Sequence, residues 1–352
     1  VARTQVGQFI LGSQDEPGPL QKLAAVAARN TKAVVQAGKP VDLSVALQRF
    51  SEEPQPRQTR KLRLLLRRYL WREAHLIRGP RIRPHRWTRR LVARSPEVRA
   101  MVAEESARTG KSAASIELEV DKILDQIAAR MRITTVRFIA FILRFLWNRI
   151  YSGVDLPAED MRRLRDSFRD ATPVLIPCHR SHLDYLLMSS QLFYRDMVIP
   201  HVVAGENLNF WPLGPLFRHC GAFFIKRSFG EDRIFPAVFQ RYLHQLVRDG
   251  FPIMFFIEGG RSRTGKLLPA RLGVLNMIMK SAQNLREGWD VNLVPIGISY
   301  EQIAEERAYR RELQGADKTP ENMGQVVKAG SIFRRRFGPV YVRVGEPIRL
   351  SE

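Results

Sequence analysis

The fold is decided by the stretch Val174-Leu-Ile-Pro-Cys-His-Arg-Ser-His-Leu-Asp184, in which an apolar run breaks into a polar corner. Positions five apart on a helix are about 140° out of phase. His179 and Asp184 can therefore meet only if His179 lies in a turn before a helix that begins near Ser181. The apolar run suits a strand that Pro177 ends, and the carboxyl end of such a strand is where α/β folds usually bind ligands.

The histidine and the aspartate of this corner are a candidate general base and its orienting partner. An imidazole with an ordinary pKa of about 6.5 can be neutral and basic at cellular pH, and a carboxylate can fix its tautomer and stabilise the imidazolium. The adjacent Cys178 could in principle accept an acyl group. Because neighbouring residues on a strand face opposite sides, we expect Cys178 to pack in the core while His179 faces the site.

A second signal is a loop rich in glycine and positive charge, Phe255-Phe-Ile-Glu-Gly-Gly-Arg-Ser-Arg-Thr-Gly-Lys266, which we call the cationic loop. Its glycines let backbone N–H groups approach an anion, and Arg261, Arg263 and Lys266 supply charge-assisted hydrogen bonds. The loop is not a nucleotide-binding P-loop, because Leu267 stands where that motif requires Ser or Thr.

A third apolar run, Ala222-Phe-Phe-Ile225, ends in the basic pair Lys226 and Arg227. Three strand-like runs that end in a base with a carboxylate, in a cationic loop and in a basic pair predict one active site. The cations predict that its substrate carries a phosphate.

Four segments now stand in a specific order along the chain. They are His179-Arg-Ser-His-Leu-Asp184, Gly221-Ala-Phe-Phe-Ile-Lys-Arg227, Phe256-Ile-Glu-Gly-Gly-Arg-Ser-Arg-Thr-Gly265 and Leu293-Val-Pro-Ile296. In these segments the chain resembles the bacterial membrane-bound glycerol-3-phosphate 1-O-acyltransferases (PlsB type), members of the glycerolipid acyltransferase superfamily with the HX4D motif. The resemblance runs from about Arg57 to the last residue. It implies a chain that is a fragment of a longer protein.

The resemblance implies transfer of a fatty acyl group from acyl-CoA or acyl-carrier protein to the sn-1 hydroxyl of glycerol 3-phosphate, giving lysophosphatidic acid. It implies that His179 is the base and Asp184 its partner. The alternative acceptors are dihydroxyacetone phosphate and lysophosphatidate. The positions expected to bind glycerol 3-phosphate, by the resemblance or by their charge, are Phe224, Lys226, Arg227, Glu258, Gly259, Arg261, Ser262, Arg263, Lys266 and Pro295.

The expected reaction needs neither a metal nor a redox cofactor, and the remaining histidines lack the paired spacing of metal ligands. The net charge of +22 in 352 residues predicts an anionic partner. Basic and apolar residues are interleaved between Arg57 and Arg99, which suits a helix on anionic lipid. The resemblance implies that this lipid surface is the cytoplasmic face of the cell inner membrane. A non-catalytic membrane- or nucleic-acid-binding protein is the remaining alternative. Without a nucleic-acid motif, no nucleic acid is expected.

The apolar arc of Ile133 to Ile150 is interrupted by arginines and is not a spanning helix. We expect it to lie at the membrane interface or, more in keeping with its width, to pack on the catalytic domain.

The pattern predicts three parts: a variable N-terminal segment with a linker (1–56), a basic helical region that can face a membrane (57–152), and an α/β acyltransferase domain (153–352). In the last part we expect a mixed β-sheet flanked by helices. Its expected strands are Val174–Pro177, Val198–Ala204, Ala222–Ile225, Ile253–Ile257, Val291–Ser299 and Val340–Val344.

Overall fold

The computed structural model describes residues 40–80, 82–226, 228–283, 285, 288–303, 305, 306, 309 and 335–352. Its contacts divide the chain into two compact units, 1–77 and 78–352. The predicted boundaries near 56 and 152 stay predictions, and residues 1–39 of the predicted N-terminal segment lie outside the described part.

The first unit contains α3 (Leu43–Gln48) and nearly all of α4 (Gln55–Arg78). Asp42 caps α3 by accepting the N–H of Ser44 at 2.8 Å, which satisfies one of the free donors at a helix start. Because α4 begins at Gln55, Pro56 lies in its first turn, where its missing N–H costs little. Pro54 and Pro56, at the end of the predicted linker, therefore lie at the start of a helix.

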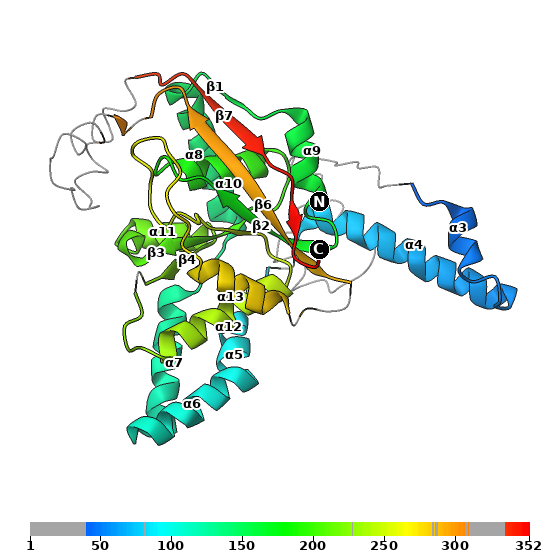
Figure 1. Ribbon diagram of the computed structural model, residues 1–352, viewed down its shortest axis with the longest axis horizontal. Coiled ribbons are helices and arrows are strands. Elements are labelled where there is room, and N and C mark those ends of the chain that lie inside the picture. Colours follow the sequence, from blue (N-terminus) through cyan, green and yellow to red (C-terminus); the bar gives the residue numbers. More distant parts are fainter. Residues whose placement is uncertain are drawn as a thin grey trace, which may run out of the picture. The chain divides into compact units, whose positions relative to one another are not determined.

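The second unit is built on a mixed sheet with the strand order β1-β7-β6-β2-β5-β3-β4, and β8 pairs with β6 (Figure 1). Strands β2 to β6 are parallel where they pair, while β7 and β8 run antiparallel to β6. The strands are β1 (Gly153–Asp155), β2 (Ala171–Pro177), β3 (His201–Gly205), β4 (Ala222–Ile225), β5 (Ile253–Met254), β6 (Asp290–Tyr300), β7 (Pro339–Val344) and β8 (Ile348–Arg349).

All six predicted strands are present, and the predicted mixed α/β fold is confirmed. The two strands that the sequence did not indicate, β1 and β8, are three and two residues long, too short to leave an apolar run. Because β2 to β6 are parallel, the loops that follow them leave the sheet at one edge. That edge carries the histidine corner, the cationic loop and Lys226.

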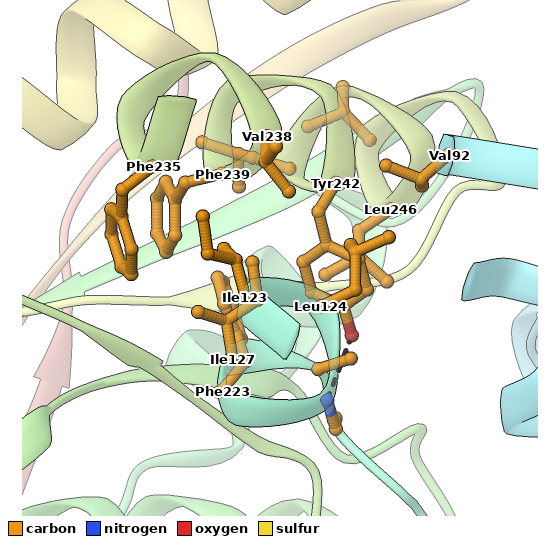
Figure 2. Packing of buried hydrophobic residues seen from close by; sticks show 14 of the residues in the cluster. Val92, Ile123, Leu124, Ile127, Phe223, Phe235, Val238, Phe239, Tyr242 and Leu246 are labelled. Atoms are coloured by element: carbon orange, nitrogen blue, oxygen red, sulfur yellow. Dashed lines mark hydrogen bonds between the residues drawn. The ribbon is translucent and has the colours of Figure 1, made fainter. Parts of the chain in front are cut away.

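One face of the sheet is covered by a helical layer: α5 (His85–Ala93), α6 (Pro96–Thr109), α7 (Ala113–Ile127), α12 (Ile234–Arg248) and α13 (Gly273–Ala282). Leu124 of α7 and Phe239 of α12 are fully buried there against Phe223 of β4 (Figure 2). The hydroxyl of Tyr242 accepts the N–H of Ala129 at 3.0 Å, so this buried phenol has a partner.

The other face carries α8 (Ile133–Ile150), α10 (Asp184–Tyr194) and α11 (Leu213–His219), while α9 (Ala158–Asp166) lies against β7. Trp147 of α8 is buried and donates to the hydroxyl of Ser190 on α10 at 2.8 Å. The opposite face of α8 exposes Phe138, Phe141 and Phe145. The arc predicted in this segment therefore packs on one side only. Among the described helices, none has the length and apolar character to cross a bilayer.

Candidate active site

The corner after β2 is a turn that Asp184 closes. Helix α10 begins at Asp184, three residues later than expected from Ser181. The Asp184 carboxylate reaches back over the turn, where Oδ2 accepts the N–H of Arg180 at 2.7 Å and of Ser181 at 2.8 Å. A carboxylate in the first turn of a helix is also favoured by the helix dipole. Ser181 caps less than expected: its hydroxyl accepts only the N–H of Leu183, at 3.1 Å.

His179 and Asp184 meet as the spacing predicted. The imidazole Nδ1 lies 3.0 Å from Oδ2 of Asp184, whose side chain is 0% exposed. The imidazole packs against the ring of Phe256, with centroids 3.8 Å apart and planes 17° apart. With Nδ1 engaged by the carboxylate, Nε2 is the nitrogen left to take a proton.

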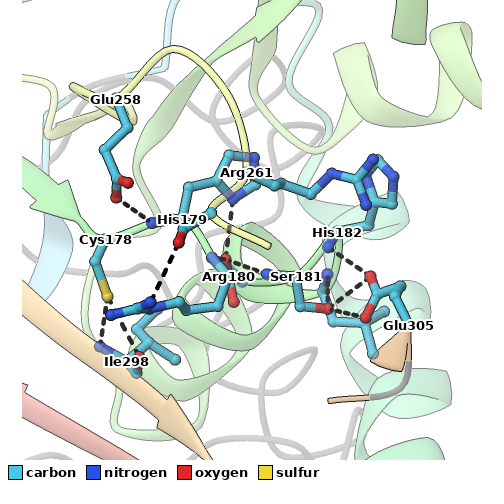
Figure 3. Close-up of polar contacts among 12 residues, drawn as sticks. Cys178, His179, Arg180, Ser181, His182, Glu258, Arg261, Ile298 and Glu305 are labelled. Atoms are coloured by element: carbon cyan, nitrogen blue, oxygen red, sulfur yellow. Dashed lines mark hydrogen bonds and ion pairs between the residues drawn. The ribbon is translucent and has the colours of Figure 1, made fainter. Parts of the chain in front are cut away.

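Glu258 and Ser262 fasten the cationic loop to this turn. The buried Glu258 carboxylate accepts the N–H of His179 at 2.9 Å and of Leu268 at 2.8 Å (Figure 3). Ser262 donates its N–H to the carbonyl of His179 at 2.8 Å, and its buried hydroxyl donates to the carbonyl of Lys266. Both side chains thus shape the loop with bonds that substrate would have to replace. Their predicted contact with glycerol 3-phosphate stays a prediction.

The cations of the loop gather around Tyr309. Arg261 donates to the Tyr309 hydroxyl at 2.9 Å, and the Arg263 guanidinium lies 6.0 Å from the Tyr309 ring. Burial raises the pKa of Tyr309 to about 12, so the phenol keeps its proton and donates it to the carbonyl of Arg180 at 3.1 Å. Lys266 is exposed on the same loop. The loop therefore presents positive charge next to the histidine corner.

Gly259 holds the loop close to a neighbouring segment. Its φ is +62°, a left-handed conformation that other residues rarely adopt. A Cβ at this position would lie 2.5 Å from Cδ of Arg271. A glycine is therefore needed here for both backbone and space.

The other predicted substrate positions that the structure describes lie in β4, just after it, or in β6. Phe224 is buried in β4, with the Arg218 guanidinium 5.1 Å from its ring. Lys226 pairs with Asp232 at 3.0 Å and lines a pocket of about 610 Å³ at the end of β4. Pro295 lies exposed in β6 beside Ile176 of β2. Arg227 lies outside the described residues.

The thiol of Cys178 is turned away from the imidazole, as expected, but the residue is only partly buried and does not belong to the core. Its Sγ donates to the carbonyl of Ile298 at 3.3 Å and accepts the N–H of Ile298 at 3.0 Å (Figure 3). The second cysteine, Cys220, has a thiol whose pKa is raised to about 11 by burial. Neither thiol is presented as a nucleophile.

Three residues of the site were missed in the sequence: Tyr300, Glu305 and Tyr309. The Tyr300 hydroxyl donates to Oδ1 of Asp184 at 2.6 Å. Glu305 accepts the hydroxyl of Ser181 and the N–H of His182, each at 2.9 Å (Figure 3). Tyr300 ends a strand parallel to β2, and this position was a usable signal. No periodicity or motif marks the other two.

Two family models match parts of this chain. Residues 160–299, which hold the histidine corner and the cationic loop, match the family model "Acyltransferase". Residues 309–352 match "Glycerol-3-phosphate acyltransferase C-terminal region". The chain is therefore a member of the acyltransferase superfamily.

Curated proteins named glycerol-3-phosphate acyltransferase match most of the chain. The one from Glaesserella parasuis serovar 5 is 38% identical over 83% of this chain and 36% of its own length. Those from Haemophilus influenzae (strain PittEE) and Pseudomonas putida are 39% and 36% identical over 78% and 95% of this chain. The chain belongs to the bacterial glycerol-3-phosphate acyltransferase family, which confirms the resemblance.

The matches cover only part of each relative. The chain spans between 33% and 40% of the length of these curated relatives. A solved structure, the 1-acyl-sn-glycerophosphate (LPA) acyltransferase PlsC from Thermotoga maritima, has a TM-score of 0.38 and 18% identity over 61% of this chain and 69% of that one.

Proposed function

We propose that this protein is a glycerol-3-phosphate 1-O-acyltransferase that transfers a fatty acyl group from acyl-CoA or acyl-carrier protein to the sn-1 hydroxyl, giving lysophosphatidic acid. One observation carries the proposal: the buried Asp184 holds His179 at 3.0 Å beside a loop of cations. A base next to a phosphate-binding loop suits a substrate that has both a hydroxyl and a phosphate. Family membership agrees with this substrate.

In the proposed mechanism, His179 acts through Nε2. It takes the proton from the substrate hydroxyl as the oxygen attacks the thioester carbonyl, and Asp184 stabilises the resulting imidazolium. The tetrahedral intermediate then expels the thiolate, which takes the proton from His179, so that an ester and a free thiol are formed. Such base catalysis typically contributes about 10²–10⁴-fold. The exchange leaves every oxidation state unchanged and needs no redox cofactor.

The phosphate of the acceptor would bind to the cationic loop. Arg261 and Arg263 bring two guanidinium groups to the turn that carries His179, and Lys266 adds an exposed ammonium. Charge-assisted bonds to a phosphate are about twice as strong as neutral ones. Because Glu258 and Ser262 tie the loop to both backbone groups of His179, a phosphate held there would be fixed relative to the base. Fixed geometry of this kind lowers the entropic part of the barrier.

The acyl chain would enter the sheet face covered by α8. A small apolar pocket of about 50 Å³ lies there between α8, α10 and α11, lined by Leu143, Leu186 and Phe217 among others. Tyr185, the residue after Asp184, also lines it. The pocket borders α10, the helix that begins at Asp184, and because it is much smaller than a fatty acyl chain it would have to widen to admit one.

The protein would work on an anionic lipid surface, at the cytoplasmic face of the inner membrane. Phe141 and Phe145 of α8 are 74% and 72% exposed, with Phe138 on the same side. Arg137 and Arg144 flank these rings and are exposed as well. Aromatic residues bordered by arginines suit the boundary between acyl chains and lipid phosphates. The basic helix α4 would add to the attraction.

The test is thiol release from palmitoyl-CoA by the full-length protein in detergent or vesicles, with each acceptor in turn. We expect release that depends on glycerol 3-phosphate, and lysophosphatidic acid as the product by mass spectrometry. Release with dihydroxyacetone phosphate or with lysophosphatidate but not with glycerol 3-phosphate would replace the proposed acceptor. No acceptor-dependent release would refute the proposal.

A further inference from the structure

A partly buried tyrosine contacts the carboxylate of Asp184. Tyr300, the last residue of β6, donates to Oδ1 of Asp184 at 2.6 Å. Residues 300–308, which include Tyr300, lie between the two family matches, 160–299 and 309–352. The bond joins the end of β6 to the first residue of α10, over a separation of 116 residues in the chain.

Asp184 needs this donor because its carboxylate is buried away from solvent. The side chain is fully buried, and its other oxygen, Oδ2, already serves His179 and the N–H groups of Arg180 and Ser181. A buried charge is costly unless its lone pairs are satisfied. Burial and the charge of Asp184 raise the pKa of Tyr300 well above its ordinary value. The phenol therefore stays protonated and can only donate to this oxygen.

A second carboxylate holds the other side of the same turn. Glu305 accepts the Ser181 hydroxyl and the His182 N–H at 2.9 Å, and burial raises its pKa. The turn is thus fixed independently of Tyr300, through Glu305 on one side and through Glu258, which accepts the N–H of His179, on the other. Loss of the Tyr300 hydroxyl should leave the turn in place and affect mainly the carboxylate.

We propose that Tyr300 is a positioning residue that fixes the Asp184 carboxylate so that Oδ2 faces Nδ1 of His179 while Oδ1 is neutralised by the phenol. This rests on the proposed function of the His179–Asp184 pair. Two consequences follow from removing the hydroxyl. The carboxylate can rotate away from its alignment with the imidazole, which lowers kcat. Without the hydrogen bond from the phenol, the Asp184 carboxylate also keeps more of its negative charge. When the carboxylate is aligned with the imidazole, this charge favours the protonated form of His179.

The variant that tests this is Tyr300→Phe. A hydrogen bond to a charged group predicts a fall in kcat of about 10- to 100-fold, with the KM for glycerol 3-phosphate changed much less. Activity requires neutral His179, so the acid limb of the pH–rate profile should move to higher pH. Other titratable or charged groups face the pair, namely Tyr151, Arg180, Glu258, Arg261, Glu305 and Tyr309, and Tyr300→Phe leaves all of them in place.

Tyr151→Phe is the matched control. Tyr151 is buried and its ring lies 5.7 Å from that of Tyr300, but its hydroxyl has no hydrogen-bond partner within the described part of the chain. Removing this hydroxyl should leave kcat and the acid limb as in the wild type. An equal effect of both variants would overturn the proposal, because it would show a general response of the core.

A double-mutant cycle with Asp184→Asn separates positioning from folding. If Tyr300 acts through Asp184, Tyr300→Phe should cause little further loss of kcat in the Asp184→Asn background. Equal losses in both backgrounds would overturn the proposal, as would a wild-type pH profile in Tyr300→Phe.

A readout without substrate keeps this inference distinct from the proposed function. The titration of the His179 ring, followed by NMR with labelled histidine, should move to higher pH in Tyr300→Phe and not in Tyr151→Phe. An unchanged titration would overturn the positioning role even if glycerol 3-phosphate is acylated. The shift would support it even if another acceptor proves to be the substrate.

Discussion

At the scale of single residues, the site depends on backbone bonds that long-range partners supply. His179 has its N–H held by Glu258, its carbonyl by Ser262 and its Nδ1 by Asp184. Of the two ring nitrogens, Nδ1 is thus engaged by Asp184, and Nε2 makes none of these bonds. An imidazole held at three points has little conformational entropy left to lose in the reaction, which lowers the entropic part of the activation barrier.

Arg261 should contribute to binding the acceptor more than to the chemical step. We expect Arg261→Gln to raise the KM for glycerol 3-phosphate by about 10- to 100-fold, because a hydrogen bond to a charged group contributes about 1.5–3 kcal/mol. Steady-state kinetics at saturating palmitoyl-CoA measure this, and kcat should change little. Arg261→Lys keeps the charge and should recover part of the loss. An unchanged KM in Arg261→Gln would remove this residue from the phosphate site.

His201 should make the protein sensitive to acid. It is buried in β3, its Nδ1–H donates to the carbonyl of Gly221 at 3.1 Å, and burial lowers its pKa from 6.5 to about 4. Between those two pH values the unfolded chain binds the proton and the folded one does not, so the free energy of unfolding falls as the pH falls. The loss is at most about 3 kcal/mol.

The measurement is chemical denaturation at several pH values between 4 and 7, with His201→Gln beside the wild type. Glutamine keeps an N–H donor but does not titrate, so the variant should lose less stability on acidification. Parallel pH dependences for the two proteins would contradict this role of His201.

The contact between His179 and Asp184 could be predicted from the sequence, because two residues five apart after a strand can meet only across a turn that precedes a helix. The bonds of Glu258 could not be predicted, because its carboxylate accepts N–H groups from residues 79 and 10 positions away; its contact with the substrate stays a prediction. Nor could the sequence show that the Lys226 ammonium pairs with Asp232. Such partners depend on how segments distant in the chain meet, which neither spacing nor composition contains.

At the scale of elements, apolar runs predicted the strands well, and polar corners predicted where they end. Helix α10 begins at Asp184 and not near Ser181 as predicted. The reason is that the Asp184 carboxylate accepts the N–H groups of Arg180 and Ser181, which holds these residues in a turn before the helix. The helical stretch before the sheet divides into separate helices, since Ser95 and Ser112 cap new starts at α6 and α7. Both serines are typical N-cap residues, but the region was predicted as one basic helical region without internal helix starts.

The exposed face of α8 should bind lipid. We expect Phe141→Ser combined with Phe145→Ser to weaken binding to vesicles with anionic lipid by at least about 10-fold, because burying one such side chain contributes about 1.5–3 kcal/mol. Vesicle sedimentation measures this. The matched control is Leu118→Ser on α7, a leucine that is 63% exposed in the same unit. Equal binding of all three proteins would exclude α8 as the lipid-binding face.

At the scale of the whole molecule, the two faces of the sheet have different tasks. The layer of α5, α6, α7, α12 and α13 forms the large apolar core, while α8, α10 and α11 enclose the small apolar pocket. The strand order could not be predicted, because the pairing of β6 with both β2 and β7 is set by contacts across the chain. What the sequence did predict was the edge at which the site lies, because parallel strands place their following loops together.

The most direct test of the account compares His179→Ala with Cys178→Ser in glycerol 3-phosphate-dependent thiol release from palmitoyl-CoA. The two residues are neighbours, but Nδ1 of His179 faces Asp184 while Sγ of Cys178 faces Ile298. We predict that His179→Ala loses about 10²–10⁴-fold in kcat and that Cys178→Ser keeps most of its activity. Full activity in His179→Ala, or loss confined to Cys178→Ser with a trapped acyl-enzyme, would contradict the base mechanism.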